Sequence, residues 1–110
     1  MPSWFGGDSS QAQNYEQLQS GNVSHQADTA HELIAGAASY EAAKAYEKHC
    51  SENGKPTSHA EAKELLAGFA GAFIDREVES RGLDFVDKEK TKYEARKQLH
   101  ETYDNNDGQF

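Results

Sequence analysis

Residues 24–58 read SHQADTAHELIAGAASYEAAKAYEKHCSENGKPTS and predict one long helix that ends in a sharp turn. Between Ser24 and Asn53, apolar residues recur at steps of three and four, at Ala27, Ala30, Leu33, Ile34, Ala37, Ala38, Ala42, Ala45 and Tyr46. This spacing places them on one face of a helix. Gly54 then offers a left-handed helix end, and Pro56 cannot continue the helix, so the chain is expected to turn there.

Two further helices are expected after this turn. Ser58 and Glu61 have the S-x-x-E spacing of a capping box, which predicts the start of a second helix at residue 58. Gly82 is expected to end this helix, because a glycine just past a helix readily adopts the left-handed conformation of a Schellman motif. A third helix with a thinner apolar stripe is expected to follow over residues 85–103.

Together these elements predict an all-α fold, a small bundle of three main helices over about residues 24–53, 58–81 and 85–103. Residues 1–22 are rich in Gly, Ser, Gln and Asn and show no sustained apolar period. We therefore expect an irregular N-terminal arm, with room for one short helical turn near Tyr15. The helical domain is expected over residues 23–104, followed by a frayed polar tail over residues 105–110.

Large apolar side chains are scarce in this chain. Leu, Ile, Val and Phe account for 16 of the 110 residues, whereas alanine alone accounts for 15. Alanine favours closely packed helices, but burial of so little large apolar surface hardly offsets the chain entropy that a lone three-helix monomer loses on folding. We therefore expect homodimerisation to complete the bundle.

Charge and apolar run length exclude several classes of protein. The formal net charge is −8 and no segment is net basic, so nucleic acid is not an expected partner. The longest apolar stretch, around residues 65–74, is far shorter than the ~20 residues that span a bilayer, so no membrane association is expected. Cys50 is the only cysteine, and the first residues show no signal-like apolar run. Both features favour a cytoplasmic location.

Two glycines interrupt the expected helices at corresponding places. Residues 31–36 (HELIAG) align with residues 63–68 (KELLAG), so Gly36 corresponds to Gly68. Duplication and a chance likeness of alanine-rich helices both remain open. A mid-helix glycine costs about 1 kcal/mol relative to alanine, so a compensating gain is expected. We predict that the gain is close approach of two helices, and the alternative is a loosely packed alanine-rich core.

This interpretation predicts a set of interface or docking residues. Ala37 follows Gly36, and Gly71 and Ala72 lie one helical turn after Gly68. Trp4 and Phe5 are two large aromatic residues on the N-terminal arm. We favour docking of this aromatic pair on the chain's own helices over a role as a hook for a partner protein. The predicted residues are Trp4, Phe5, Gly36, Ala37, Gly68, Gly71 and Ala72.

The histidines offer one weak metal-binding pattern. His25, Asp28 and Glu32 lie on one helix face, where an imidazole and two carboxylates are able to hold a divalent ion. A solvated acidic helix face is the commoner meaning of such a group. His31 is expected to form a hydrogen bond across a helix contact instead.

No catalytic residue and no cofactor are predicted, because no nucleophile, base and orienting group stand at a recognisable spacing. The candidates for paired carboxylates are Glu41, Glu47, Asp75 and Glu77. The sequence does not place any two of them together, so an exposed helix face is their default interpretation.

The stretch from His31 to Glu47 resembles a segment characteristic of the fungal CipC-like proteins, a family of small proteins named for induction by concanamycin. The likeness continues through GKP at residues 54–56, SHA at 58–60, AKELLAGFAGA at 62–72, and then Gly82, Asp84, Phe85 and Asp87, with a Trp-Phe pair near the N-terminus. It covers about residues 24–103. Tyr40, Ala43 and the pair Phe73-Ile74 depart from the usual Phe, Met and Glu-Val.

The resemblance implies a small fungal, cytosolic protein associated with stress or antibiotic response and without an established catalytic activity. We therefore expect a non-enzymatic protein that acts through protein–protein contacts as a homodimer. The alternative is a carrier of a small molecule or a divalent metal. It would use an apolar pocket between helices near Tyr46, Phe69 and Phe73, or the helix face of His25, Asp28 and Glu32.

Overall fold

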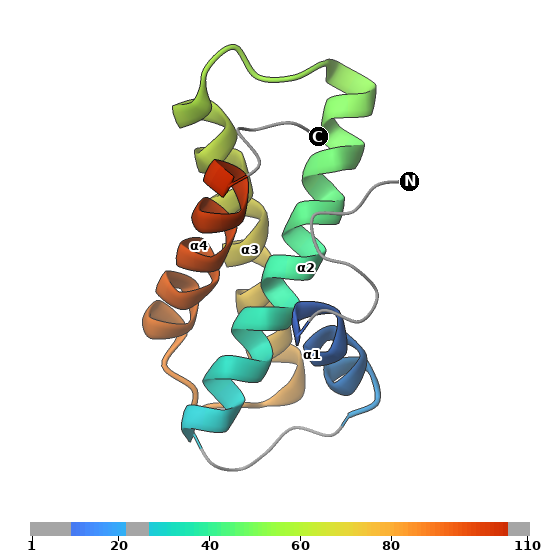
Figure 1. Ribbon diagram of the computed structural model, residues 1–110. Coiled ribbons are helices and arrows are strands. Elements are labelled where there is room, and N and C mark those ends of the chain that lie inside the picture. The colour runs from blue at the N-terminus through green and yellow to red at the C-terminus, as the bar shows by residue number, and fades with distance from the viewer. Residues whose placement is uncertain (1–9, 22–26, 106–110) are drawn as a thin grey trace.

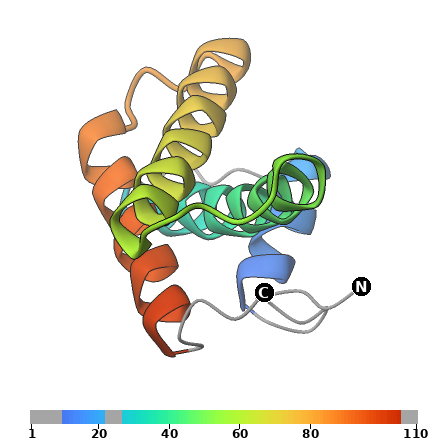
Figure 2. The ribbon, with the colours of Figure 1, turned by 90° about the horizontal axis from the view of Figure 1, so that it is seen from above.

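The computed structural model describes residues 10–21 and 27–105, which form four helices (Figure 1). In chain order they are α1 (Ser10–Gln19), α2 (Ala27–Asn53), α3 (His59–Arg81) and α4 (Lys88–Asn105). No strand occurs in these two ranges. Helix α2 contacts each of the other three helices, and α3 also contacts α4. Seen from above, the axes of α2, α3 and α4 point in clearly different directions (Figure 2).

The predicted all-α class is confirmed, but the prediction of three helices is wrong, because α1 forms within the arm that was expected to be irregular. Ala12, Tyr15 and Leu18 follow one another at steps of three and so share one helix face. Ala12 and Leu18 are buried, and Tyr15 packs against the core. The polar composition of α1 does not predict a helix, so packing against the rest of the protein stabilises it.

The ends of α3 follow their local sequence, as predicted. The Ser58 hydroxyl accepts a hydrogen bond from the Glu61 backbone N–H at 3.1 Å. Gly82 adopts a left-handed φ of 65°, and the Leu83 N–H donates to the Val78 carbonyl at 3.0 Å. These two contacts are a helix N-cap and a Schellman motif.

Replacing Ser58 by alanine is expected to lower the free energy of unfolding by about 1 kcal/mol, because the Glu61 N–H loses its acceptor. Denaturation with urea measures this change. Thr57→Ala is the matched control, since the exposed Thr57 hydroxyl donates only to the Glu61 side chain. An equal loss in both variants would contradict the assignment of Ser58 as the cap.

Small side chains line the contact between α2 and α4. Ser39 is fully buried on α2, and its hydroxyl oxygen lies 2.9 Å from the Ala35 carbonyl oxygen and 3.2 Å from the Ala95 carbonyl oxygen. Ala95 belongs to α4, and it is fully buried, as is Ala35. A serine side chain that reaches the backbone of the neighbouring helix requires the two helices to lie close together. We name Ala35, Ser39 and Ala95 the α2–α4 seam.

Gly36 brings α1 against α2. It is buried, and a Cβ atom built there would overlap the Asn14 side-chain amide of α1 and lie 3.0 Å from the Asn14 Cβ. Gly36 therefore lies against a neighbouring helix, but this helix is α1, which was not expected, and the atoms nearest to the added Cβ belong to the Asn14 side chain. The core lies beneath these contacts, and its largest fully buried apolar side chains are Leu18, Ile34, Leu66, Ile74 and Leu99.

Candidate functional site

The outer face of α3 presents a row of exposed residues spaced four apart, which we call the α3 stripe: Ala60, Glu64, Gly68, Ala72, Arg76 and Ser80. A Cβ built on Gly68 would meet no atom within 4 Å. Packing among residues 10–21 and 27–105 therefore does not account for this mid-helix glycine, in contrast to Gly36. The expected intrachain close approach is absent at Gly68 among the described residues.

A hollow of about 500 Å³ opens beside the α3 stripe and is lined by Glu61, Glu64, Leu65, Gly68 and Phe69. Leu65 and Phe69 are half-buried and pack on the core, so they offer apolar surface. The Phe69 ring also meets the His49 ring of α2 edge-on, with 6.1 Å between their centroids. Apolar surface beside two carboxylates suits a group with an aliphatic stem and a cationic end.

An aromatic cluster lies where α1, α2 and α3 meet. The Tyr15 ring centroid is 5.1 Å from that of Tyr40 and 6.4 Å from that of Phe73. The Lys44 ammonium lies 5.7 Å from the Tyr15 centroid and 5.4 Å from the Tyr40 centroid. These contacts tie three helices together through stacking and cation–π attraction.

Two of the candidate carboxylates converge on this cluster. Burial raises the pKa of Tyr15, and the charge of Glu41, a hydrogen bond to Glu41 and the charge of Glu77 raise it further. Glu77 is only 8% exposed and is paired with Arg81 at 2.8 Å. The phenol therefore stays protonated at neutral pH and donates a hydrogen bond, a role that holds the helices together.

His31 links α2 to the start of α4, as expected for a hydrogen bond across a helix contact. It is buried, and its Nε2 accepts a hydrogen bond from the Asp87 N–H at 2.9 Å. Its Nδ1 is buried without a hydrogen-bond partner among the described residues. The Asp87 carboxylate in turn accepts from the Lys90 N–H at 3.2 Å and caps α4.

Glu47 on α2 is a half-buried residue whose carboxylate oxygens are buried. Within the described ranges, both of its carboxylate oxygens lack exposed surface and a hydrogen-bond partner. Burial raises the pKa of this carboxyl. The folded protein therefore binds the Glu47 proton more tightly than the unfolded chain, and the stability from this proton is lost as the pH rises through the raised pKa.

Replacing Glu47 by glutamine is accordingly expected to raise the free energy of unfolding at pH 7 and to leave it nearly unchanged at pH 4. Urea denaturation at the two pH values measures this difference. Glu52→Gln, at an exposed position of the same helix, is the control and should show no such gain. A gain for Glu47→Gln that is larger at pH 4 than at pH 7 would contradict the assignment.

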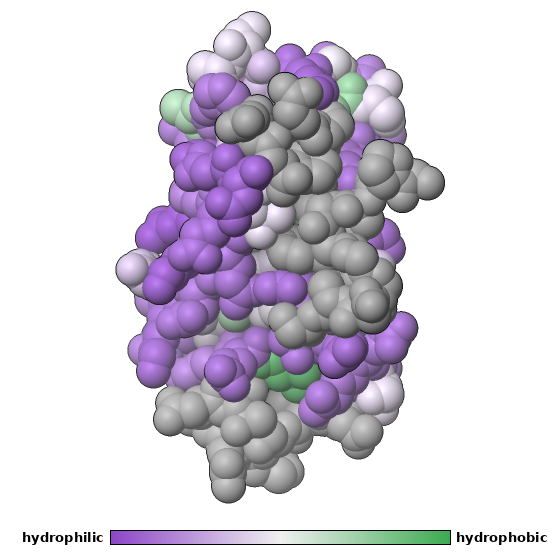
Figure 3. All heavy atoms as spheres, viewed as in Figure 1, coloured by the Kyte–Doolittle hydropathy of each residue, from purple (hydrophilic) through white to green (hydrophobic). Residues whose placement is uncertain are grey.

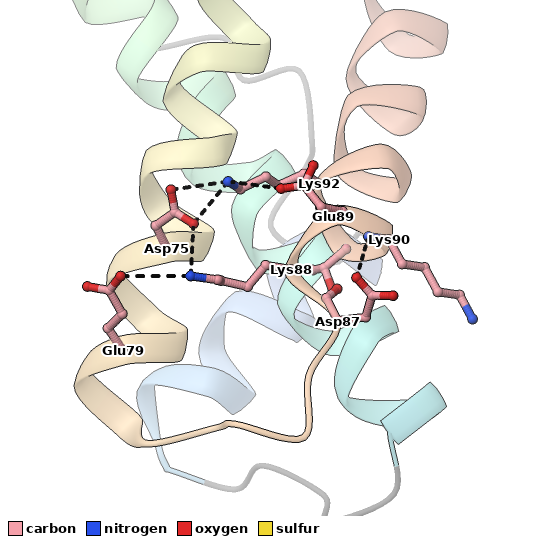
Figure 4. A network of polar contacts seen from close by, with 8 residues as sticks. Asp75, Glu79, Asp87, Lys88, Glu89, Lys90 and Lys92 are labelled. Atoms are coloured by element: carbon pink, nitrogen blue, oxygen red, sulfur yellow. Dashed lines mark hydrogen bonds and ion pairs between the residues drawn. The ribbon is translucent and has the colours of Figure 1, made fainter.

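Ion pairs join α3 to the start of α4 (Figure 4). The Lys92 ammonium lies 3.0 Å from an Asp75 carboxylate oxygen, and the Lys88 ammonium lies 3.8 Å from both Asp75 and Glu79. Within α4, Lys92 also pairs with Glu89, at 3.9 Å. The contacts to Asp75 and Glu79 cross to α3, which the sequence did not predict. The side of the molecule formed by α4 is almost entirely hydrophilic (Figure 3).

The structure places the sequence-predicted residues in different surroundings. Trp4, Phe5 and His25 lie outside the described residues, as does the side chain of Asp28, whereas Glu32 is exposed on α2. No group of three or more His, Cys, Asp or Glu side chains suited to a metal occurs in the part of the chain that the structure describes.

The remaining candidates divide between the core and the surface. Tyr46 and Phe73 are buried in the core, whereas Phe69 lines the hollow beside α3. Ala37 is buried next to Gly36, and Ala72 is exposed. Gly71 is half-buried, and a Cβ there would lie 3.9 Å from carbon atoms of Lys92.

Sequence reasoning missed the charged members of the α3 stripe. It singled out Gly68 and Ala72 for helix contacts but not Glu64 and Arg76, which continue the same spacing of four in both directions. That spacing is visible in the sequence, and it is the signal that could have identified them.

Among the described helices, none is both long and apolar enough to cross a membrane.

No curated protein and no solved structure matches the chain. A family model described as virulence factor CipC-like matches residues 14–106, a range that includes α2, α3, α4 and the Asn14 contact of α1. The chain therefore belongs to the CipC-like family.

Proposed function

We propose that this protein is a non-enzymatic, cytoplasmic protein of stress response or virulence that acts through protein–protein contacts made by the outer face of α3. The description of its family as virulence factor CipC-like supports the biological setting. A fungal source and a role in antibiotic response belong to the same proposal, on the resemblance of residues 24–103.

The exposed glycine at position 68 is the observation that supports the proposed mode of action. A glycine in an exposed helix interior costs about 1 kcal/mol, and no neighbour among the described residues uses the space that it leaves. Ala72 extends this small-residue surface by one helical turn, and the hollow beside it adds apolar surface from Leu65 and Phe69. Such a surface gains most when another polypeptide packs closely on it.

Site-specific photo-crosslinking tests this proposal in cells of the organism that makes the protein. Benzoylphenylalanine in place of Ala72 is expected to give protein adducts, because this position lies at the centre of the α3 stripe. The same group in place of Lys97, which is exposed on α4, is the control and should give few adducts. Equal yields at the two positions, or no adduct at position 72, would refute the proposal.

A small-molecule carrier is the second candidate function, and the hollow lined by Leu65 and Phe69 is the observation that favours it. Its two carboxylates, Glu61 and Glu64, favour a cationic ligand with an apolar body. Native mass spectrometry of the protein purified from its own host tests this function. A bound small molecule that is lost in a Glu64→Arg variant would support it, and a ligand-free mass would count against it.

A further inference from the structure

We propose that the partner of the α3 stripe is a second copy of this chain, packed antiparallel so that Glu64 of each copy meets Arg76 of the other. This inference rests on the proposed function, because it names the partner of the same face. It goes further by giving the register and the charge pairs of the contact.

The order of residues along the α3 stripe is self-complementary. It reads Glu64, Gly68, Ala72, Arg76, with a negative end, two small residues and a positive end. Residues four apart form a ridge on a helix, and two such ridges interdigitate when helices cross at about −50°. A twofold axis between positions 68 and 72 sets Gly68 opposite the partner's Ala72 and Glu64 opposite the partner's Arg76. Symmetry makes each of these pairs occur twice.

The residues at the two ends of the α3 stripe do not obstruct this register. Ala60 and Ser80 lie outside the contact around positions 68 and 72, and both are small and exposed. No like charges are opposed along the stripe in this arrangement. The parallel arrangement opposes like charges, because it sets Glu64 beside the partner's Glu64 and Arg76 beside the partner's Arg76.

Arg76 is available for such a contact. Its side chain is 65% exposed, and among the described residues it forms an ion pair with Glu77 at 4.0 Å. Glu77 has a closer partner in Arg81, at 2.8 Å. The Arg76 guanidinium also lies 5.2 Å from the Phe73 ring centroid, so its stem already follows the surface of α3.

The hollow beside the α3 stripe fits the chemistry of this arginine. Its lining combines the carboxylates of Glu61 and Glu64 with the apolar side chains of Leu65 and Phe69. An arginine side chain has an aliphatic stem and a planar cationic end that binds carboxylates in a bidentate manner. The register that places the partner's Arg76 opposite Glu64 delivers the guanidinium to this hollow. The hollow shares Glu64 with the charge order and adds the Glu61 carboxylate and apolar surface to it, so both features favour the same occupant.

A single helix crossing buries a small interface, so the dimer is expected to be weak and to dissociate at high salt. Sedimentation equilibrium of the full chain over micromolar to millimolar concentrations measures it. Glu64→Arg and Arg76→Glu are each expected to raise the dimer dissociation constant about tenfold or more, because each change opposes like charges twice in the symmetric dimer.

An equimolar mixture of the Glu64→Arg and Arg76→Glu variants tests the charge pairing most directly. The first variant carries two positive ends and the second two negative ends, so the mixture is expected to form a heterodimer with nearly the wild-type dissociation constant. Recovery of dimerisation in the mixture also shows that both variants are folded. Lys97→Glu and Glu101→Arg on α4 are the matched charge reversals and should leave dimerisation unchanged.

Three results would overturn this inference. The wild-type chain could stay monomeric at millimolar concentration, the dimer dissociation constant could be unchanged by both charge reversals, or the mixture of the two variants could fail to dimerise. The proposed function is judged separately by the crosslinks from position 72. Adducts with a different protein there would retain the proposed function and reject the second copy as the partner, whereas the absence of any adduct would reject both.

Discussion

Replacement of Ala95 by leucine is expected to lower the free energy of unfolding by about 3 kcal/mol. Ala95 is fully buried on α4, and its carbonyl oxygen lies 3.2 Å from the Ser39 hydroxyl of α2. Helices that approach this closely leave no space for three additional carbon atoms. The larger side chain must therefore push α2 and α4 apart or adopt a strained rotamer.

Urea denaturation measures this loss, and Ala60→Leu is the matched control. Ala60 is exposed near the start of α3, so the same added side chain should change the free energy of unfolding by less than about 0.5 kcal/mol. Loss of the Ser39 contact gives a second readout, because hydrogen exchange in the middle of α4 should quicken in Ala95→Leu. If Ala95→Leu unfolds like wild type, the α2–α4 seam is not closely packed.

Replacement of Gly36 by alanine is expected to lower the free energy of unfolding by up to about 2 kcal/mol, although alanine is the better helix former. The gain in helix propensity is about 1 kcal/mol, and overpacking against Asn14 opposes it with about 1–3 kcal/mol. The clash is hard to relieve, since the Asn14 Cβ itself would lie 3.0 Å from the new methyl group. This Cβ moves only if α1 moves.

A double-mutant cycle with Asn14→Ala locates the source of this cost. Removing the Asn14 amide relieves its overlap with position 36 but leaves the Asn14 Cβ in place. The cost of Gly36→Ala should therefore be smaller in the Asn14→Ala background, with part of it remaining. An identical cost in both backgrounds would show that Asn14 is not the obstructing residue.

Helix ends were predictable from the sequence because they depend on neighbours in the chain. The Ser58 cap needs only the N–H of Glu61, three residues away, and the turn at Gly82 needs only a residue that tolerates a positive φ. The long periodic stretch before Gly54 predicted α2 to within a few residues for the same reason. In each of these elements the deciding interactions are local.

Contacts between helices were less predictable, and the two related glycines show why. Gly36 and Gly68 stand in nearly identical local sequences, yet the first is buried against Asn14 and the second is open. A helical pattern defines a face, but it does not specify which other helix covers that face. The helix that covers Gly36 is α1, which forms because Ala12 and Leu18 are buried.

The candidate site was predicted only in part for a similar reason. Gly68 and Ala72 stood out because small residues within a helix require an explanation. The hollow depends on how Leu65 and Phe69 lie on the folded core, and the availability of Arg76 depends on the pairing of Glu77 with Arg81. Neither arrangement can be read from spacing alone.

The central claim is that Gly36 serves a contact within the chain, whereas Gly68 serves a contact outside it. The most direct test is to compare the free energies of unfolding of Gly36→Ala and Gly68→Ala at a protein concentration where the chain is monomeric. We predict opposite signs, a loss for Gly36→Ala and a gain of about 1 kcal/mol for Gly68→Ala, because only position 36 faces a neighbouring helix. Changes of the same sign in both variants would contradict the claim.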